Sequence, residues 1–379
     1  MTLKKSLGYW IALLLLSFPV PLRAAEMIRV AVLVDRPVLS LGGPGTLRID
    51  TPAGLKVLRS QKSVQLRPGR SGIKINGLDT HQRELTVRTD ESAFDLNGVR
   101  YSGTLTVKQR PQGLLAVNQV EVEDYLKGVV PAEIPPDWPP EALKVQAVSA
   151  RTYALYQRDL RREMEYDLLA TTADQVYSGL SDEHLESNTA IAETAGLVAA
   201  YHGHLILAAY HSTSAGRTED AAAVWGIDIP YLRGVDCPFD RYSPRFQWIR
   251  AIPMDRIQED FRSAGYAIGM ISTITPFDST PSGRVGRVRI LHSDGELILT
   301  GAELRRVIGY SEVPSTRFSM EGVGQKFKFS GKGSGHGVGL CQWGAKEMAQ
   351  MGYSFRTILE YYYPGVDIVA YEPTLEASP

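Results

Sequence analysis

Residues 130–162 read VPAEIPPDWPPEALKVQAVSARTYALYQRDLRR and predict a proline-dense loop followed by one long helix. The loop extends from Val130 to Pro140, because each proline fixes its own backbone and restricts the residue before it. The helix extends from about Pro140 to Arg162, since proline is tolerated in the first turn and apolar residues, most of them small, recur at helical spacing. The sequence therefore predicts a rigid loop next to a closely packed helix.

The segments on either side of this stretch have different secondary-structure patterns. From Ile28 to about Gln119, short strand-like runs alternate with turns that contain glycine and proline, which is typical of an all-β region. The later part predicts a helix over residues 182–194, a strand over residues 196–210 and a last helix over residues 342–351. Strands come first and strands and helices mix afterwards, which predicts an α+β fold.

These changes of pattern divide the chain into four parts. We expect a signal peptide over residues 1–25, a β-rich N-terminal region over residues 26–97, a mixed α+β domain with a groove over residues 98–370, and a C-terminal tail over residues 371–379. The β-rich region carries no chemical motif, so we expect it to serve in packing or positioning. The candidate chemical residues all lie in the mixed domain.

The first 25 residues have the features of an export signal. Lys4 and Lys5 give a positive start, an apolar run follows from Gly8 to Pro21, and two alanines at positions 24 and 25 suit a signal peptidase. The apolar run is shorter than the ~20 residues of a membrane-spanning helix. The sequence predicts an exported protein of the periplasm or cell envelope, and an uncleaved membrane anchor is the alternative.

Composition excludes several classes of protein. The chain has 379 residues, and 41 Lys and Arg residues oppose 42 Asp and Glu residues, so it lacks the basic excess of a nucleic-acid-binding protein. With 44% hydrophobic residues, a chain of this length can form a full core. Two cysteines are too few for a disulfide-rich scaffold, a four-cysteine zinc ribbon or an iron–sulfur site.

Glu133 is the first candidate for chemistry, because it lies in the predicted proline-dense loop between Ala132 and Ile134. Apolar neighbours disfavour the charged form of a carboxyl group, so its pKa rises toward the range that a general acid needs near neutral pH. A solvated loop glutamate is the alternative. The acidic run over residues 121–124 would supply a second carboxylate, and the spacing does not decide whether it does.

Two segments that contain histidine are further candidates. Residues 210–216 read YHSTSAG and place His211 among hydroxyl groups at the end of an apolar strand, as in a polar substrate site. A histidine satisfied by those hydroxyls is the alternative. Residues 331–344 read GKGSGHGVGLCQWG, with glycine at every second position from 331 to 339 around His336. In an extended segment these glycines let a ligand or strand approach the backbone. The spacing matches neither a phosphate-binding loop nor a dinucleotide fingerprint.

Cys237 and Cys341 both lie next to these segments. In an oxidising compartment they would pair as a disulfide, and two buried free thiols are the alternative. A nucleophilic Cys341 near the start of a helix is a third hypothesis, because the helix would lower the pKa of the thiol. A zinc site formed by both cysteines with His211 and His336 lacks the short ligand spacing of zinc motifs. We therefore assign no metal and no cofactor.

Three blocks of the mixed domain together resemble the SpoIID/LytB family, the stage II sporulation protein D group. They follow one another in the family's order over about residues 98–370, and the three together are far more specific than any one alone. The blocks read VPAEIP (130–135) with EALKVQAVSARTYA (141–154), HSTSAGRT (211–218) with WG (225–226) and PYL (230–232), and GHGVGL (335–340) with QWGA (342–345) and YYPG (362–365). Ala215, Cys341 and Trp343 depart from the usual glycine, serine and tyrosine, and these departures do not affect the glutamate of the first block.

The resemblance implies a peptidoglycan-active protein. Sporulation members of the family are lytic transglycosylases that cut glycan strands already stripped of peptides, whereas the LytB branch enhances cell-wall amidases. The family's catalytic acid is the glutamate after Val-Val-Pro-Ala, which aligns with Glu133. The expected partners are peptidoglycan glycan strands and a cell-wall amidase. We expect no nucleic-acid partner. We expect contact with a membrane only if the signal segment remains uncleaved.

The same blocks supply the residues to which we assign glycan binding: Gln146, Arg151, His211, Ser212, Ser214, His336 and Gln342. Arg151 lies on the predicted helix, where it would pair with the lactyl carboxylate of a peptide-free muramic acid; a buried structural arginine is the alternative. We expect His211 and His336 to line one groove with Glu133. A non-catalytic glycan-binding protein that assists an amidase is the alternative to a lytic transglycosylase.

Overall fold

The computed structural model describes residues 25–43, 45–51, 54–59, 63–373, 375 and 377. The predicted signal peptide lies outside these residues except for its last position, and the predicted C-terminal tail is described only in part. Helices and several sheets occur together, which confirms the α+β fold predicted from the sequence. None of the helices in the described part of the chain has the length and apolar character needed to cross a membrane.

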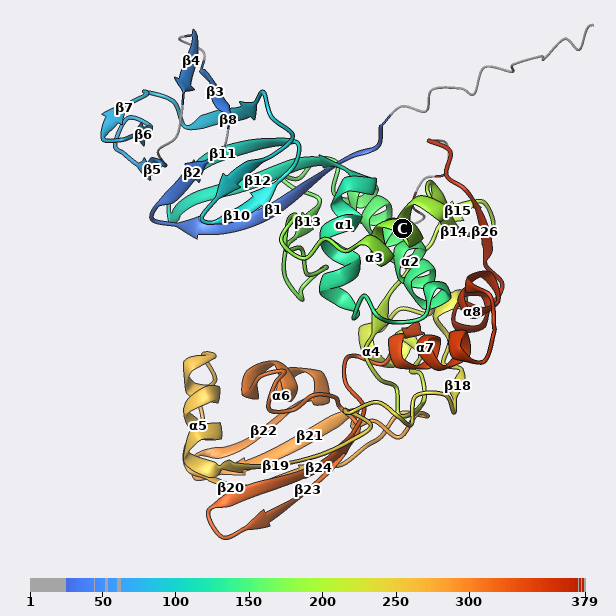
Figure 1. The fold of residues 1–379 in the computed structure, drawn as a ribbon. Coiled ribbons are helices and arrows are strands. Elements are labelled where there is room, and N and C mark those ends of the chain that lie inside the picture. The colour runs from blue at the N-terminus through green and yellow to red at the C-terminus, as the bar shows by residue number, and fades with distance from the viewer. Residues whose placement is uncertain are drawn as a thin grey trace, which may run out of the picture.

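Two β-sheets form the N-terminal part of the chain, drawn in blue and cyan in Figure 1. Their strands alternate between buried and exposed side chains, as at Leu85 and Val87, which are buried, and Glu84 and Arg88, which are exposed. In spatial order, the first sheet consists of β13 (Leu168–Leu169), β1 (Met27–Arg36), β12 (Gly113–Glu121), β11 (Thr104–Arg110), β8 (Glu84–Thr89), β3 (Thr46–Thr51) and β4 (Gly54–Arg59). The second consists of β10 (Val99–Tyr101), β9 (Phe94–Leu96), β2 (Leu39–Gly42), β5 (Val64–Pro68), β6 (Ile73–Ile75) and β7 (Leu78–Asp79).

The first sheet continues past residue 97, where the sequence led us to expect the end of the β-rich region. β12 pairs with β1, with Ile28 opposite Val120, and β11 pairs with β12. β12 then leads directly into the first helix. Side chains of both sheets and of the helices that follow therefore belong to one hydrophobic cluster.

Two helices, α1 (Val122–Glu133) and α2 (Pro140–Leu160), lie at the centre of the molecule. α2 confirms the predicted long helix. The loop predicted from Val130 is wrong in its first residues, because α1 continues through Pro131 to Glu133. A proline inside a helix removes one backbone hydrogen bond, and burial of the apolar face of α1 offsets this loss. Glu133 therefore lies in the last turn of a helix and not in a loop.

The other elements around α1 and α2 are short. The helices are α3 (Leu185–Glu193), α4 (Ala221–Trp225), the 3-10 helix η1 (Pro230–Leu232), α7 (Gln342–Gln350) and α8 (Phe355–Tyr362), and the strands are β14 (Leu197–Tyr201), β15 (His204–Leu205), β16 (Tyr210–His211), β17 (Gly216–Arg217), β18 (Asp236–Cys237), β25 (Leu340–Cys341) and β26 (Asp367–Ala370). α3 and α7 confirm two predicted helices, whereas α8 was not predicted. The strand predicted over residues 196–210 is broken into β14, β15 and β16, with His202 and Gly203 at positive φ between the first two.

Short strand pairings bring distant parts of the chain together. β16 pairs with β25 in parallel, with Tyr210 opposite Leu340 and His211 opposite Cys341. β17 pairs with β18, with Gly216 opposite Cys237. The second and third sequence blocks are therefore neighbours in space although more than a hundred residues separate them in the chain.

Residues 247–332, which we call the inserted unit, have a hydrophobic cluster of their own. The unit is drawn in yellow to orange in Figure 1 and was not recognised in the sequence. It consists of β19 (Gln247–Pro253), α5 (Met254–Ser263), β20 (Ile271–Pro276), β21 (Arg287–His292), β22 (Gly295–Thr300), α6 (Gly301–Ile308), β23 (Phe318–Val323) and β24 (Lys326–Lys332). The strands form two sheets, in the orders β19-β24-β23 and β20-β21-β22.

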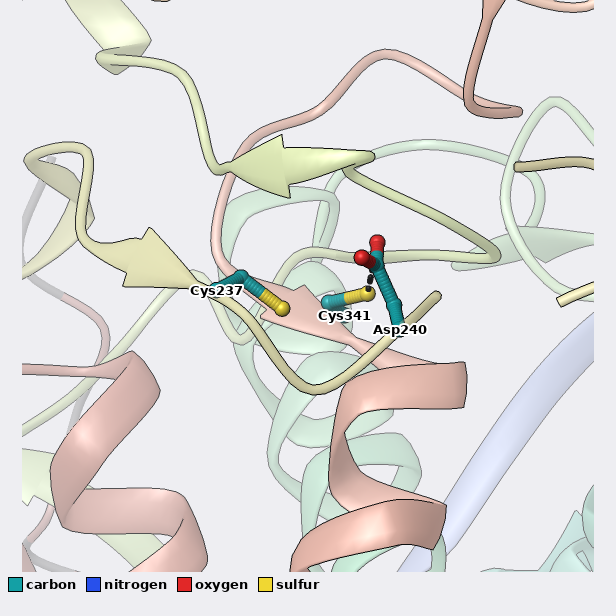
Figure 2. Close-up of side chains that lie close together, drawn as sticks. All are labelled: Cys237, Asp240 and Cys341. Carbon is teal, nitrogen blue, oxygen red and sulfur yellow. Dashed lines mark hydrogen bonds between the residues drawn. The ribbon is translucent and has the colours of Figure 1, made fainter. Parts of the chain in front are cut away.

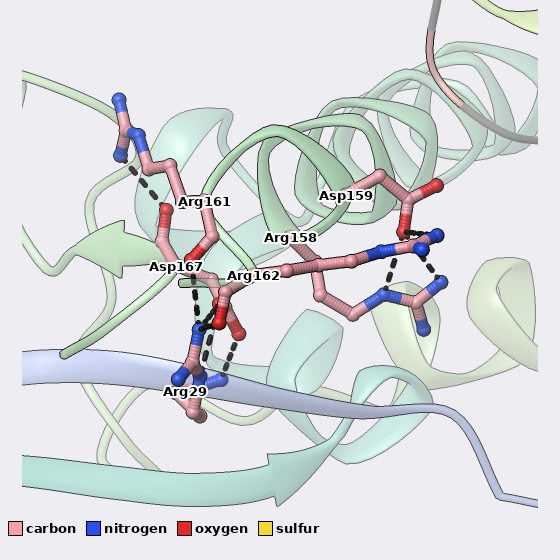
Figure 3. A network of polar contacts seen from close by, with 6 residues as sticks. All are labelled: Arg29, Arg158, Asp159, Arg161, Arg162 and Asp167. Atoms are coloured by element: carbon pink, nitrogen blue, oxygen red, sulfur yellow. Dashed lines mark hydrogen bonds and ion pairs between the residues drawn. The ribbon is translucent and has the colours of Figure 1, made fainter. Parts of the chain in front are cut away.

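An arginine on β1 fixes the end of α2 against the first sheet (Figure 3). The Arg29 guanidinium donates to the carbonyl oxygens of Arg161 and Arg162, which follow α2, at 2.9 and 3.2 Å. It also pairs with Asp167, whose other oxygen accepts from the Arg29 backbone N–H at 2.7 Å. The side chain of Asp167 is only 1% exposed, so this ion pair is largely shielded from water.

We predict that Asp167→Ala lowers the free energy of unfolding by about 3 kcal/mol, the lower end of the cost of removing one partner of a buried ion pair. The lower end applies because Arg29 is one-third exposed. Urea unfolding measures the change. Asp50→Ala, in the exposed pair of Asp50 with Arg88, is the matched control and should cost less than about 1 kcal/mol. Equal effects of the two substitutions would contradict the structural role of the Arg29 pair.

Candidate active site

A cavity of about 800 Å³ brings the predicted site segments together with the inserted unit. Five residues singled out in the sequence line it: Glu133, His211, Ser212, His336 and Gln342. The two histidines therefore line one groove with Glu133, as predicted. The other lining side chains were not assigned to the site from the sequence, among them Tyr153, Asp174, Tyr210, Arg305 and Tyr310.

The Glu133 carboxyl is held by hydrogen bonds from three different segments. The backbone N–H of Val176 donates to Oε1 at 2.9 Å. The side chains of Tyr210 and Gln342 also form hydrogen bonds with the carboxyl. Burial raises the pKa of Glu133, and this effect outweighs the hydrogen bonds, which lower it. The group is thus poised to carry a proton at a higher pH than an exposed glutamate.

A chain of buried polar groups determines how Tyr210 is oriented. Gln175 Nε2 donates to the Tyr210 hydroxyl oxygen at 3.0 Å, and the Tyr125 hydroxyl donates to Gln175 Oε1 at 3.1 Å. Because the Tyr210 oxygen already accepts from Gln175, its own hydrogen is free to be donated to Glu133. Tyr210 directly precedes His211 in the second block, and that position was the only sequence signal for it.

Asp174 is the second carboxylate that lines the cavity, and its environment is the opposite of that of Glu133. Arg161 donates to both of its oxygens, at 2.9 and 3.1 Å. The Tyr153 hydroxyl and the Leu169 backbone N–H donate to them as well, at 3.0 and 2.8 Å. A carboxylate whose two oxygens are both held by the protein in this way is not free to attack a substrate.

The neutral imidazole rings of His211 and His336 line one side of the cavity, next to the Trp225 ring. His336 Nδ1 accepts from the Val338 backbone N–H, so its Nε2 carries the hydrogen and donates to the Tyr210 carbonyl oxygen at 2.9 Å. Burial lowers the pKa of His336 to about 4 and that of His211 well below its ordinary value. The His336 ring lies 5.6 Å from the His211 ring and 5.4 Å from the Trp225 ring.

The inserted unit contributes a cation and an aromatic ring to the cavity. Arg305 on α6 donates from Nε to the Val313 carbonyl oxygen at 2.8 Å, and its guanidinium lies 4.6 Å from the centre of the Tyr310 ring. Neither partner carries a negative charge. Burial lowers the pKa of Arg305 to about 10, which leaves the group charged at neutral pH. No carboxylate of the described residues forms an ion pair with Arg305, so the cavity presents a positive charge that is available to a ligand.

Three residues assigned to glycan binding do not line the cavity. Arg151 is fully buried and forms two hydrogen bonds with Glu123, at 2.8 and 2.7 Å, so the structural alternative is correct and the prediction of a lactyl contact is wrong. Gln146 lies beneath the cavity, where its Oε1 accepts from Gln342 at 3.3 Å. The Ser214 hydroxyl is buried and donates to a carboxylate outside the cavity.

The glycine-rich segment does not have the extended conformation that we considered from the sequence. Gly333, Gly335, Gly337 and Gly339 all have positive φ, a backbone conformation that other residues rarely adopt. A Cβ atom on Gly335 would come within 2.6 Å of the His211 Cβ, and one on Gly337 would come within 2.5 Å of the centre of a guanidinium of the inserted unit. The glycines therefore let other residues approach the backbone closely, as we expected from the sequence. They do so in a backbone with positive φ and not in an extended one.

The two cysteines lie together outside the cavity and are free thiols, so the predicted disulfide is not formed (Figure 2). Cys237 and Cys341 are fully buried beside Asp240. The ligand atoms of these three residues all lie within 4.8 Å of one another. The grouping differs from the zinc set considered from the sequence, because Asp240 takes part in it and neither histidine does.

Comparisons with known proteins agree with this arrangement. A family model described as Stage II sporulation protein matches residues 110–201, which include α1 and α2. A second, described as Domain of unknown function (DUF8618), matches residues 235–339 and so covers the inserted unit.

Full-length relatives extend the match over most of the chain. An uncharacterized protein of Brachyspira hyodysenteriae (strain ATCC 49526 / WA1) is 34% identical over 82% of this chain and 83% of its own. Stage II sporulation protein D of Bacillus amyloliquefaciens is 32% identical over 67% of this chain and 75% of its own. The amidase enhancer of Bacillus subtilis (strain 168) is 29% identical over 79% of this chain and 49% of its own. The chain belongs to the SpoIID/LytB family.

We predict that the His336 ring stays neutral between about pH 5 and pH 8, where an exposed imidazole gains its proton. Burial lowers its pKa to about 4, so protonation is delayed until the solution is more acidic than that range. NMR of the full chain with ¹⁵N-labelled histidine follows the ring nitrogens directly, with free histidine as the reference. A His336 titration midpoint above about pH 6 would show that the ring is solvated.

Proposed function

We propose that this protein is an exported cell-wall enzyme, a lytic transglycosylase that cleaves the bond between N-acetylmuramic acid and N-acetylglucosamine in peptide-free glycan strands. The observation that carries the proposal is the state of Glu133, a carboxyl that burial favours in its protonated form and that faces the cavity. Membership of the SpoIID/LytB family supports a role at the cell wall. The names of the relatives, stage II sporulation protein D and amidase enhancer, support the same role.

In the first step Glu133 acts as a general acid. The protonated carboxyl donates its hydrogen to the glycosidic oxygen while the bond to C1 of the muramoyl ring breaks, and positive charge develops on that ring. The carboxylate that remains is stabilised by the Val176 N–H and the Tyr210 hydroxyl. These donors are already in place, so little rearrangement accompanies the transfer.

In the second step the same group acts as a base. The Glu133 carboxylate accepts the proton of the muramoyl 6-hydroxyl, and that oxygen attacks C1 to leave a 1,6-anhydro end. A glycosidase that uses water or an enzyme nucleophile needs a second free carboxylate. Asp174, the other carboxylate of the cavity, is held by Arg161. A reaction whose nucleophile belongs to the substrate needs only one carboxyl, which is what the cavity offers.

The shape and charge of the cavity suit a glycan that bears carboxylates. Trp225 and Tyr310 offer flat faces on which sugar rings pack. Arg305 supplies the cation to which the lactyl carboxylate of a muramic acid without its peptide would bind. This assignment replaces Arg151, which is occupied by Glu123.

An amidase-enhancing protein that binds glycan without cutting it is the competing hypothesis, and the name of the Bacillus subtilis relative supports it. The two functions differ in whether the Glu133 proton is used. In a protein that only binds, nothing requires the carboxyl to be buried and its pKa to be raised, because a solvated carboxylate would bind as well. Burial of the Glu133 carboxyl therefore favours the hypothesis of a catalytic protein over that of a protein that only binds glycan.

We predict that Glu133→Gln leaves glycan binding intact and lowers the cleavage rate by about a hundredfold or more, because the amide cannot donate the required proton. Mass spectrometry of peptide-free glycan strands after incubation detects the anhydro ends. In the unaltered protein cleavage should fall as the pH rises through the elevated pKa of Glu133, since the acid is then deprotonated. Asp174→Asn should lower the free energy of unfolding, because it breaks the ion pair with Arg161, and should change the pH at which cleavage falls much less. More than half of the activity left in the Glu133 variant would overturn the mechanism.

We predict that Arg305→Met weakens binding of peptide-free glycan strands about ten- to hundredfold, the range for loss of a charge-assisted hydrogen bond. Binding is measured by calorimetry in the Glu133→Gln background, so that no substrate is consumed. Chitin oligosaccharides, which lack the lactyl carboxylate, should bind with little change. Arg306→Met is the matched control, because Arg306 is the next residue of α6 and is exposed. Equal losses for both ligands would assign Arg305 a structural role.

A further inference from the structure

Cys237, Asp240 and Cys341 form a compact set of potential ligands, drawn in Figure 2. The three come from separate places: β18, the loop that follows it, and β25 directly before α7. Their sulfur and oxygen atoms all lie within 4.8 Å of one another, and Cys341 Sγ is 3.4 Å from Asp240 Oδ2. The two sulfur atoms and one carboxylate oxygen thus converge on one buried point.

Asp240 is the second observation that points to a cation there. Its side chain is 1% exposed, and Oδ1 has no hydrogen-bond partner among the described residues. Oδ2 accepts from the Ser214 hydroxyl at 2.9 Å, from the Ala215 N–H at 2.6 Å and from Cys341 Sγ. All three donors are neutral. A buried carboxylate is normally paired with a cation or coordinated to a metal, and none of these donors supplies the positive charge.

We propose that Cys237, Asp240 and Cys341 bind one zinc ion. Two thiolate ligands select zinc over magnesium and calcium, which prefer oxygen ligands only. Binding releases the two thiol protons to solvent and places two thiolates and one carboxylate around a dication, which compensates the charge of Asp240. The Ser214 hydroxyl is the neighbouring oxygen that would complete four ligands.

The surroundings of the three side chains fit a closed, structural site. A Cβ atom on Gly344 would lie 2.7 Å from Cys237 Sγ and 2.0 Å from the Tyr362 hydroxyl oxygen, so only glycine lets the first turn of α7 pass this close. The Tyr362 hydroxyl lies 3.1 Å from Cys237 Sγ and closes another side. Both sulfur atoms are buried. A metal ion at this site would bind as the chain folds, and no substrate would reach it.

The proposed site would act on the cavity through the chain and not by contact with substrate. Cys341 lies opposite His211 in the β16–β25 pairing, and the next residue is Gln342, which forms a hydrogen bond with Glu133. Zinc bound by Cys341 would fix the start of α7 to the loop at Asp240. It would thereby hold Gln342 at the distance that its contact with Glu133 requires.

Metal analysis of the full chain tests the proposal. Protein purified without chelator should contain about one zinc ion per chain, as expected for a structural site. Cobalt substituted for zinc should give the intense thiolate-to-cobalt absorption band. Cys237→Ser, Cys341→Ser and Asp240→Asn should each lose most of the bound metal. Asp236→Asn is the matched control, because Asp236 is a carboxylate on β18 directly before Cys237, its side chain is 78% exposed, and the variant should keep the metal.

Several outcomes would overturn the proposal. One is a metal-free protein in which two thiols react per unfolded chain and cobalt produces no thiolate band. Another is a chain in which no thiol reacts until it is reduced, which would establish a disulfide instead. Metal retained equally by the Cys341→Ser variant would place it elsewhere. If the variants fail to fold, the cobalt titration of the unaltered chain still decides. The outcome is independent of whether the protein cleaves glycan.

Discussion

The ion pair between Arg151 and Glu123 fixes the arrangement on which the site depends. Arg151 is fully buried on α2, and Glu123 lies in the first turn of α1, so their double hydrogen bond joins the two central helices. Arg151 also donates to the Leu197 carbonyl oxygen of β14, and Glu123 accepts from the Gly196 N–H. Removing one partner of such a pair costs about 3–5 kcal/mol, because the other charge is left buried and unpaired. The ion pair thereby fixes the orientation of α1, and so the position of Glu133, the last residue of that helix.

Two carboxyl groups of one cavity show how surroundings divide chemical roles. Asp174 is held by a guanidinium and two further hydrogen-bond donors. Glu133 has hydrogen-bond donors but is paired with no cation of the described residues, and burial has the largest effect on its pKa. A carboxyl held in an ion pair is occupied by the protein, whereas a buried carboxyl whose pKa is raised can carry a proton into the cavity. The separation here depends on Arg161 reaching Asp174 from the C-terminal end of α2.

The sequence predicted the residues of the site better than their surroundings. Glu133, His211 and His336 lie in blocks whose composition is informative locally, and the structure brings them into one cavity. Arg151 was misassigned because helical spacing does not tell which face of α2 meets α1. Arg305 was missed because its approach depends on the folding of the inserted unit. Contacts between segments that are not neighbours in the sequence leave no periodic signal, and for the same reason the hydrogen bond between Gln175 and Tyr210 was not predicted.

The glycine-rich segment explains how an inserted unit with its own core can contribute to a site in another part of the chain. Because Gly337 has no side chain, Arg284 of the inserted unit lies against the backbone there and donates to the Ser214 carbonyl oxygen at 3.2 Å. Arg317 of the same unit donates to the Ala215 carbonyl oxygen. Two arginines thus join the inserted unit to the loop that follows His211. A joint at that loop keeps Arg305 at a constant distance from Glu133, as the proposed recognition of a charged group at a fixed place on a glycan requires.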